Sequence, residues 1–270
     1  MSEFLGKYVV VTGGTQGLGA AVARLFADRG AAGIITCGRT LENGETIAAQ
    51  IKVDTGCPVH FVQADLADVV ACRKIIATAK DIFGTLDILV NAAAITDRGS
   101  ILDTSPELFD RMMAVNLRAP FFLMQDAAKL MRKTKTEGAI INIASMSSLG
   151  GQPFVSAYCT SKGGLATLTK NTAYGLMRDR IRVNGLNIGW MASDGEDAMQ
   201  KSYHNADENW QVGAAAAQPF GRLIDPAEVA RAVAFLAGPE SGLMTGSMVN
   251  FDQSIWGAYD SPPSPSEALA

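Results

Sequence analysis

Seven short apolar segments alternate with longer segments of helical periodicity along nearly the whole chain. The apolar segments are 7–12, 33–37, 59–63, 86–90, 139–144, 181–186 and 247–251, and the helical segments are 18–29, 41–54, 68–83, 106–135, 156–178 and 226–237. Strands that are separated by helices pair in parallel, because each helix returns the chain to the same edge of the sheet. The pattern predicts an α/β fold with a doubly wound, seven-stranded parallel sheet.

The domain organisation follows from the absence of a linker or composition break within this alternation. We expect a single domain over 1–260. A polar insertion rich in methionine and alanine follows the sixth apolar segment, and we expect it to form a substrate lid at about 190–218. The tail 261–270 is rich in proline and serine, so we expect it to be poorly ordered.

Charge and hydropathy exclude several classes of partner. The formal net charge is −4 and no long run of lysine or arginine occurs, so the chain lacks the basic face that nucleic acid requires. No apolar segment is long enough for a membrane span. Residues 1–7 lack the pattern of a secretion signal, and we expect a cytoplasmic protein.

Metal binding is not expected from the cysteines. Cys37, Cys57, Cys72 and Cys159 form no C-x-x-C pair and have no histidine at ligand spacing. We expect reduced thiols that are mostly buried, with Cys159 standing apart because it follows Tyr158.

A glycine-rich turn joins the first strand to the first helix. Residues 12–19 read TGGTQGLG, with Gly13, Gly17 and Gly19 in the spacing G-x-x-x-G-x-G. Glycines let the backbone approach a diphosphate, and a helix N-terminus offers free N–H groups and partial positive charge. The turn predicts a dinucleotide site, although an ordinary structural turn also fits it.

The tip of the second strand bears on the choice of cofactor. Gly38 stands where an acidic residue would bind the 2′-hydroxyl of NAD, and Arg39 follows it. A guanidinium suits a 2′-phosphate, so we favour NADP over NAD. A solvated Arg39 at a strand end is the alternative.

The predicted chemistry rests on Ser145, Tyr158 and Lys162. Tyr158 and Lys162 are four residues apart in a helical segment and share one face. An ammonium beside a phenol favours the phenolate and lowers its pKa from about 10. Ser145 ends the fifth strand, where it can bond a substrate oxygen. A Tyr-x-x-x-Lys pair alone is usually a surface pair, so the combination with Ser145, Asn116 and the glycine turn is what indicates catalysis.

In this order the motifs resemble those of the short-chain dehydrogenase/reductase family, of the simple single-domain type. The matching segments are 12–19, 65–66, 89–93, 115–117, 143–145, 158–162, 180–184, 236–240 and 245–246. The resemblance covers about residues 5 to 257 and implies a Rossmann-type fold with hydride transfer between a nicotinamide and an alcohol or carbonyl carbon. It also implies a homotetramer packed through the helices at 106–135 and 156–178.

The resemblance assigns roles to individual residues. Tyr158 is the general acid/base, Lys162 also holds the nicotinamide ribose, Ser145 stabilises the substrate oxygen, and Asn116 positions a water for proton relay. The expected cofactor-binding residues are Gly13, Thr15, Gln16, Gly17, Leu18, Gly19, Arg39, Asp65, Leu66, Asn91, Ala92, Tyr158, Lys162, Gly189, Met191 and Ser193.

Four departures from the family pattern indicate an altered pocket. Ala94 adds a methyl group where the family has glycine, and Ile188-Gly189 replaces its Pro-Gly. Ser193 stands in place of a threonine that contacts the carboxamide. Gln253 and Ser254 replace two glycines after the last strand. None of these changes removes a catalytic group.

The expected substrate is a sugar, a polyol or another small polar hydroxy compound. Candidate substrate contacts are Thr96, Ser147, Gln152, Trp190 and His204, because hydroxyl groups are held by polar side chains around an aromatic platform. His204 is equally an ordinary lid residue. Two rival functions remain open: reduction of a 3-oxoacyl thioester on an acyl carrier protein, and a non-catalytic cofactor-binding scaffold.

Overall fold

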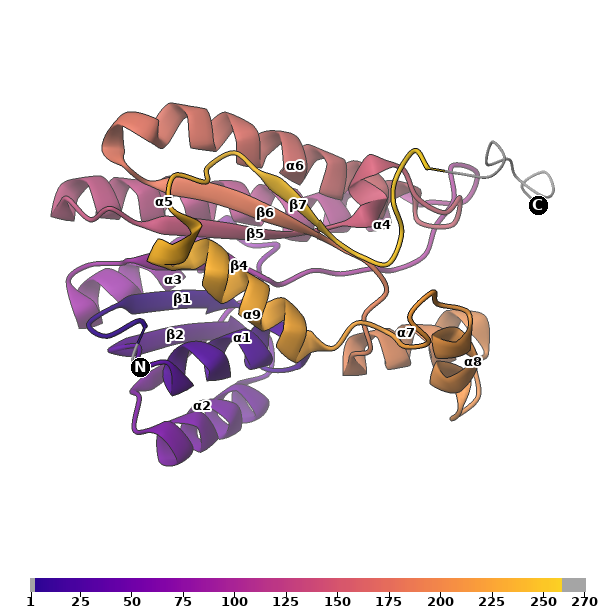
Figure 1. Ribbon diagram of the computed structural model, residues 1–270, viewed down its shortest axis with the longest axis horizontal. Coiled ribbons are helices and arrows are strands. Elements are labelled where there is room, and N and C mark those ends of the chain that lie inside the picture. Colours follow the sequence, from indigo (N-terminus) through magenta and orange to yellow (C-terminus); the bar gives the residue numbers. More distant parts are fainter. Residues whose placement is uncertain (1–2, 259–270) are drawn as a thin grey trace.

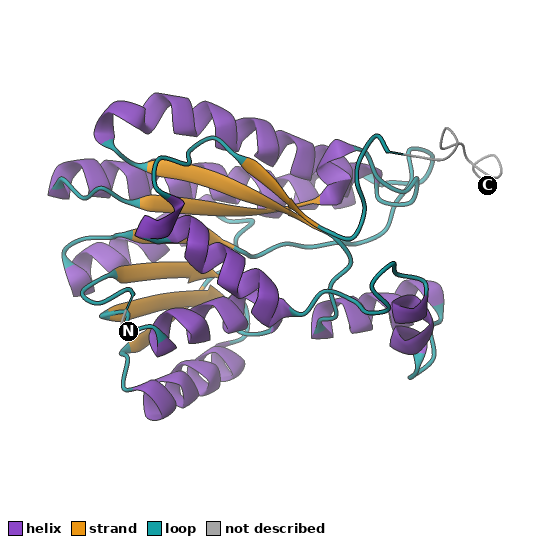
Figure 2. Ribbon diagram, in the orientation of Figure 1, coloured by secondary structure: helices purple, strands orange, loops and turns teal. Residues whose placement is uncertain are grey.

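The computed structural model describes residues 3–258 as a seven-stranded sheet in which every pair of neighbours is parallel (Figures 1 and 2). The strand order is β3-β2-β1-β4-β5-β6-β7. The strands are β1 (Tyr8–Thr12), β2 (Gly33–Gly38), β3 (Val59–Gln63), β4 (Ile88–Asn91), β5 (Ala139–Ser145), β6 (Arg182–Ile188) and β7 (Met248–Phe251). The predicted fold class is confirmed, and each strand lies within two residues of its predicted bounds.

The central strands are apolar along their length because helices cover both faces of the sheet. All seven residues of β5 are buried, and four of the five in β1 are. Strands covered on both faces bury alternate side chains in two different cores, so they need apolar residues at every position. The edge strand β7 is only partly buried.

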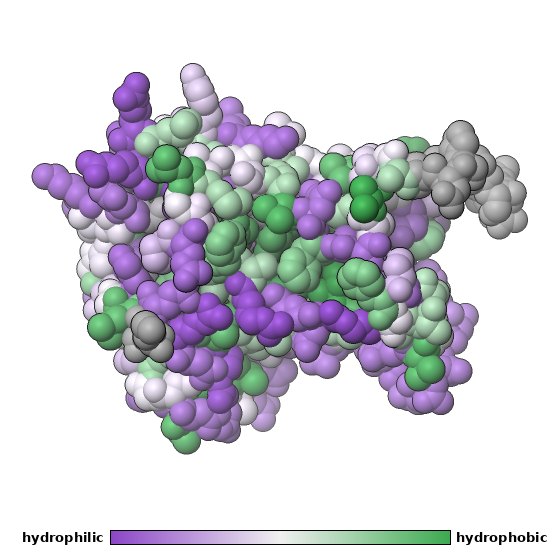
Figure 3. All heavy atoms as spheres, viewed as in Figure 1, coloured by the Kyte–Doolittle hydropathy of each residue, from purple (hydrophilic) through white to green (hydrophobic). Residues whose placement is uncertain are grey.

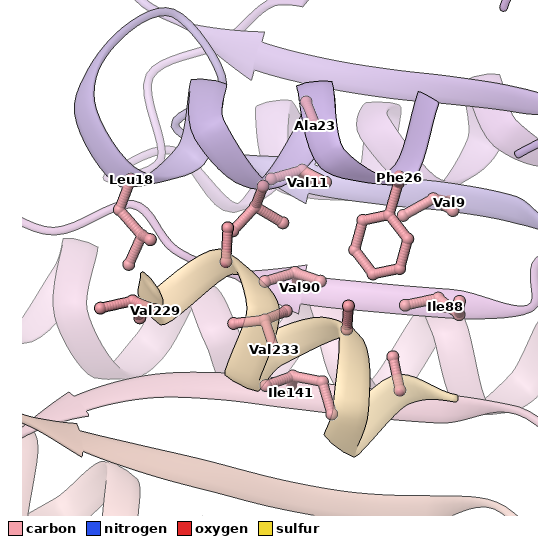
Figure 4. Close-up of a cluster of buried hydrophobic side chains, with 14 of the residues drawn as sticks. Val9, Val11, Leu18, Ala23, Phe26, Ile88, Val90, Ile141, Val229 and Val233 are labelled. Atoms are coloured by element: carbon pink, nitrogen blue, oxygen red, sulfur yellow. The ribbon is translucent and has the colours of Figure 1, made fainter. Parts of the chain in front are cut away.

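One face of the sheet is covered by α1 (Gly17–Asp28), α2 (Leu41–Thr55) and α9 (Pro226–Ala237). Figure 4 shows Phe26 of α1 and Val233 of α9 directed at the strands, against Val9, Val90 and Ile141. These side chains are almost fully buried. This core fixes the start of α1 at the end of β1, which is where the glycine turn lies.

The opposite face is covered by α3 (Val69–Phe83), α5 (Ala119–Thr134) and α6 (Ser156–Leu176). Its core contains Ile75, Leu123 and Met131 against Val10 and Ile140 of the sheet, all fully or almost fully buried. The helix α6 extends past the end of β5 and carries Tyr158 and Lys162 toward the carboxyl edge of the sheet.

The helical segment predicted over 106–135 is interrupted, and the prediction of one regular segment is wrong at this point. The structure forms α4 (Pro106–Met113), a π-helical turn at Ala114–Arg118 and then α5. In a regular α-helix the carbonyl of Asn116 would accept from the N–H of residue 120, but residue 120 is proline and has none. The extra residue of the π turn accommodates this missing bond.

The insertion after β6 forms two helices that were absent from the predicted helical segments, namely α7 (Asp194–His204) and α8 (Trp210–Ala216). They lie beyond the carboxyl ends of the strands, beside the body of the domain (Figures 1 and 2). No residue of α7 is buried, so the helix lacks the apolar stripe by which sequence reasoning detects helices. The Ser193 hydroxyl caps α7 by accepting from the N–H of Glu196.

Short helical turns at Met146–Leu149, Met177–Asp179 and Pro239–Ser241 complete the described chain. The predicted disorder of 261–270 falls outside the described residues. Within 3–258, no helix has the length and apolarity that crossing a membrane requires.

Candidate active site

A large cleft of about 1510 Å³ follows the carboxyl ends of the strands. It is centred where the strand order reverses, between β1 and β4. Ligands of open α/β sheets bind at such a reversal, because the loops after the two central strands leave the sheet in opposite directions. The cleft has a dinucleotide end over β1, β2 and β3 and a chemical end over β5 and α6.

The glycine turn is built for close approach of a ligand to the backbone. Gly13 and Gly17 have φ of +71° and +51°, which side chains other than glycine rarely adopt. A Cβ at Gly19 would overlap the carbonyl oxygen of Gly13. The N-terminus of α1 opens onto the cleft at Gly17 with no side chain capping it. Free N–H groups and a bare backbone fit the diphosphate of a dinucleotide.

The tip of β2 excludes an acidic residue by packing. A Cβ at Gly38 would lie 2.6 Å from Cγ2 of Thr15, so no carboxylate fits there without rearrangement. Arg39 is exposed at the cleft and has no carboxylate within 4.0 Å among the described residues. Asp65 is engaged by Arg111 at 2.9 Å, which lowers the pKa of Asp65. Arg39 is thus the cation available to a ligand at this end.

Ser145, Tyr158 and Lys162 meet at the chemical end of the cleft. Ser145 is the last residue of β5, and its hydroxyl oxygen accepts from the N–H of Ser147 at 3.1 Å. Lys162 is 2% exposed, and its ammonium donates to the carbonyl of Ile143 at 2.7 Å. The Nζ atom lies 5.7 Å from the centre of the Tyr158 ring.

The electrostatics of this group differ from the sequence expectation. We expected Lys162 to lower the pKa of Tyr158; instead, burial raises the pKa of Tyr158 to about 12, with the Ser145 hydrogen bond acting in the opposite direction. Burial also lowers the pKa of Lys162 to about 8. The physical reason is desolvation, which disfavours the charged form of both groups. In the protein alone, Tyr158 is therefore a protonated phenol.

The Asn116 side chain does not reach the cleft. Its oxygen accepts from the N–H of Ile95 at 2.9 Å, and its Nδ2 donates to the carbonyl of Ile95 and to the hydroxyl of Ser161. The residue thus ties the loop after β4 to α6, one residue before Lys162. Its main-chain carbonyl is the one that Pro120 leaves without an α-helical donor.

Nearly all the predicted cofactor residues line the cleft. Asn91 is the exception: it is 3% exposed, and its Nδ2 donates to Oδ1 of Asn142 in β5 at 2.8 Å, so it joins two strands. The residues that line the cleft as predicted are Gly13, Thr15, Gln16, Gly17, Leu18, Gly19, Arg39, Asp65, Leu66, Ala92, Tyr158, Lys162, Gly189, Met191 and Ser193.

The substrate candidates Thr96, Ser147, Gln152, Trp190 and His204 also line the cleft. Sequence reasoning missed further lining residues from four separate segments: Arg98, Phe154, Glu196, Gln200 and Trp256. No motif marks them. The one available signal was charge in the loop after β4 and in the insertion after β6, where Arg98 and Glu196 stand.

Gly189 shows why a glycine follows β6. A Cβ at this position would overlap the Asp252 carboxylate, which follows β7. The Gly189 N–H donates to the carbonyl of Phe251 at 3.0 Å. The turn below the chemical end is therefore held by the last strand rather than by a proline.

The fold and this cleft define a nicotinamide-dinucleotide oxidoreductase with a serine, tyrosine and lysine at its chemical end. A family model described as enoyl-(acyl carrier protein) reductase matches residues 13–253. An uncharacterised oxidoreductase of Thermotoga maritima is 37% identical, over 93% of this chain and 97% of its own length. A sorbitol dehydrogenase of Cereibacter sphaeroides is 32% identical, over 93% of this chain and 98% of its own.

Among solved structures, L-sorbose reductase from Gluconobacter frateurii, in complex with NADPH and L-sorbose, aligns with a TM-score of 0.89 at 25% identity. The alignment covers 96% of this chain and 99% of that one. The chain belongs to the short-chain dehydrogenase/reductase family, and it is an oxidoreductase acting on CH–OH groups.

Proposed function

We propose that this protein interconverts an alcohol and a carbonyl on a sugar or polyol, with NADP as cofactor and Tyr158 as general acid/base. The observation that carries the proposal is the placement of Ser145, Tyr158 and Lys162 in the same cleft as the glycine turn. A bound nicotinamide supplies or receives the hydride. The protein's own residues then handle the substrate oxygen and its proton.

Proton transfer is assigned to the Tyr158 hydroxyl. Its pKa of about 12 makes it a proton donor toward a carbonyl oxygen in the reductive direction. Ser145 at the end of β5 bonds the same substrate oxygen. Lys162, buried behind the tyrosine, favours the phenolate when it is protonated.

Asn116 acts as a positioning residue in this proposal. Through its bonds to Ile95 and Ser161 it fixes the loop after β4 against the helix that carries Lys162. Its main-chain carbonyl, with no α-helical donor, is where we place a water for proton relay.

The sugar or polyol class is supported by the lining of the chemical end. Polar side chains surround the partly exposed indole of Trp190 there. The relatives named sorbitol dehydrogenase and L-sorbose reductase act on compounds of this kind. The preference for NADP is supported by Arg39 and the closed position at Gly38, and by the NADPH in the L-sorbose reductase complex.

Reduction of a 3-oxoacyl thioester is the second candidate. The matching family model, described as enoyl-(acyl carrier protein) reductase, supports it only as far as the carrier-bound substrate. A carrier protein is acidic and needs a basic surface, whereas Arg98 and Arg111 at this cleft both lie beside carboxylates. A non-catalytic scaffold has no need of Ser145, Tyr158 and Lys162 together.

We also propose a homotetramer in the cytoplasm, with residues 190–218 as a lid. Phe121 of α5 and Tyr174 of α6 expose 45% and 82% of their surface, and α5 and α6 are helices that the family packs together. Figure 3 shows further hydrophobic side chains beside β7, an edge strand that is open to pairing. Light scattering measures the mass directly.

The test is a turnover screen of sorbitol, galactitol, L-sorbose and a 3-oxoacyl thioester with NADP(H) and NAD(H), followed by absorbance of the reduced nicotinamide. We expect turnover of a polyol or ketose with NADP(H). Turnover restricted to the thioester would reject the sugar class, and a strong preference for NAD would reject the role of Arg39.

A further inference from the structure

Two opposite charges face each other in the substrate part of the cleft. Arg98 comes from the loop after β4 and Glu196 from the lid helix α7, and both line the cleft. Arg98 Nη2 lies 3.9 Å from Glu196 Oε1, which is beyond hydrogen-bond distance. Their side chains are only 15% and 20% exposed. The pair is thus close and mostly desolvated, but not joined.

Neighbours on three segments hold Arg98 in place. Its Nη1 donates to the carbonyl of Thr96 at 2.9 Å, and its Nε donates to Nε2 of His204 at 3.2 Å. Its guanidinium lies 5.6 Å from the centre of the Phe154 ring, against which His204 also packs edge-on. These contacts leave the donors of Nη2 without a hydrogen bond among the described residues.

Glu196 is held independently of Arg98. Its Oε1 accepts from Nε1 of Trp190 at 3.0 Å and from Nε2 of Gln200 at 2.7 Å. Trp190 is in turn stacked on Trp210 of α8, with ring centres 5.9 Å apart. Within the described chain, Oε2 of Glu196 accepts no hydrogen bond. A free donor and a free acceptor therefore stand side by side, each fixed by its own neighbours.

Both groups line the same cleft as Tyr158. Arg98 and Glu196 also act on the pKa of Tyr158 in opposite directions, the arginine lowering it and the glutamate raising it. A substrate that occupies the cleft with its reacting carbon at Tyr158 can therefore reach this pair with its remaining hydroxyl groups.

We propose that Arg98 and Glu196 are specificity-determining residues that select an uncharged polyhydroxylated substrate. A substrate hydroxyl accepts from Nη2 of Arg98 and donates to the Glu196 carboxylate, which a carboxylate group cannot do. This inference rests on the proposed function, because it concerns the substrate of the same cleft.

The charges around the pair support an uncharged substrate. Asp97 also lines the cleft, where its carboxylate accepts from the Tyr203 hydroxyl at 3.2 Å. At this part of the cleft Arg98 is accompanied by two carboxylates, so a substrate anion gains Arg98 but meets Glu196 and Asp97. A neutral polyol meets no such repulsion, and its hydroxyl groups can bond both Arg98 and Glu196.

The test compares two matched substrate pairs, sorbitol with gluconate and galactitol with galactonate, in which one terminal CH₂OH becomes a carboxylate. The measured quantity is the ratio of kcat/KM for polyol and acid. We expect the wild type to favour the polyol at least about tenfold, as the loss of hydrogen bonds to charged groups implies. Glu196→Gln should lower this ratio, mainly through a lower KM for the acid, and Arg98→Met should raise it.

Controls separate specificity from folding of the lid. Glu208→Gln removes a lid carboxylate that pairs with Lys201 outside the cleft, and it should leave the ratio unchanged. Arg98→Lys retains the charge and should keep much of the wild-type ratio. If Arg98→Met does not fold, the comparison of Arg98→Lys with Glu196→Gln tests the inference instead.

Opposite shifts in the two variants support the inference. If polyols are turned over but Glu196→Gln and Arg98→Met change the polyol-to-acid ratio in the same direction, the inference is overturned and the proposed function stays intact. A wild type that favours the acids overturns it as well. If the enzyme turns over none of these four compounds and no sugar of the screen above, the proposed substrate class and the inference are both overturned.

Discussion

The two ends of the cleft differ in whether backbone or side-chain atoms form their surface. At the dinucleotide end, the ligand surface is backbone: Gly13, Gly17 and Gly19 sit where a side chain would collide or adopt an unfavourable φ. At the other end the surface is formed by side chains, among them Arg98 and Glu196, which come from the loop after β4 and from α7, a helix without buried residues.

This difference separates the part of the cleft whose geometry the sheet fixes from the part whose side chains the insertion after β6 can vary. Backbone geometry is set by the sheet and its two cores, so the dinucleotide end tolerates little substitution. The substrate end depends on surface hydrogen bonds, which can be exchanged without disturbing the cores. Matched substitutions at the two ends should therefore have unequal effects.

The largest difference is expected between two tyrosines. Tyr158→Phe removes the proton-transfer group, and kcat should fall about 10³-fold with little change in cofactor affinity. Tyr203→Phe, in α7, removes only the hydrogen bond to Asp97 of the loop after β4 and should lower kcat less than about tenfold. Steady-state kinetics and cofactor titration measure both. Appreciable turnover by Tyr158→Phe would show that another group transfers the proton.

Two lysines should differ in the pH dependence of stability. Lys162 has a folded-state pKa of about 8 against an ordinary 10.5, so its desolvation cost is full below pH 8 and disappears as the pH approaches 10.5. Relative to Lys162→Met, the wild type should therefore gain about 3 kcal/mol of unfolding free energy from pH 7 to 10.5. Denaturant titrations across this range measure the difference.

The control is Lys201→Met in the lid, because the lid lysine is paired with Asp197 and Glu208 and its pKa is raised. It should show no such dependence below pH 10.5. A flat difference between wild type and Lys162→Met would mean that the buried lysine is not desolvated in solution.

Two glycines test the backbone argument next. Gly19→Ala places a Cβ against the Gly13 carbonyl, so we expect a loss of about 1–3 kcal/mol in stability and weaker cofactor binding. Gly213→Ala in α8 meets nothing within 4 Å and should raise helix stability by up to about 1 kcal/mol. Thermal unfolding with and without NADP distinguishes them. Equal effects would contradict the view that the two ends differ in tolerance.

The smallest effect is expected at Arg39. Arg39→Ala should raise the KM for NADPH about tenfold, through loss of a charge-assisted bond to the 2′-phosphate, and leave NADH unchanged. Arg24→Ala serves as control, since Arg24 pairs with Asp28 and Asp54 outside the cleft. An equal rise in KM for NADPH and NADH would mean that Arg39 binds a part of the dinucleotide that the two cofactors share.

The sequence predicts the dinucleotide end better than the substrate end for the same physical reason. Glycine spacing and period-two apolar runs are local signals, and the strands, the turn and Tyr158 with Lys162 follow from them. The approach of Arg98 to Glu196 depends on contacts between residues that are 98 positions apart in the chain, and the pKa of Tyr158 depends on burial. Neither can be obtained from spacing alone.

The π turn illustrates an intermediate case. Pro120 is visible in the sequence, and the absence of its N–H identifies Asn116 as the carbonyl without an α-helical donor. Local chemistry can therefore predict that the helix is perturbed there. The form of the turn is not given by Pro120 alone, and α5, which follows the turn, packs against α3 and α6, contacts that the local sequence does not reveal.

The overlap that any Cβ at Gly189 would make with Asp252 restricts the order in which this chain can evolve. The two positions are far apart in sequence, yet a side chain at 189 requires the Asp252 side chain to move or to be replaced by a smaller one. A mutation at 189 in the presence of Asp252 is thus expected to cost more than the same mutation after a change at 252. Homologues should show these positions varying as a pair, with the change at 252 the older one.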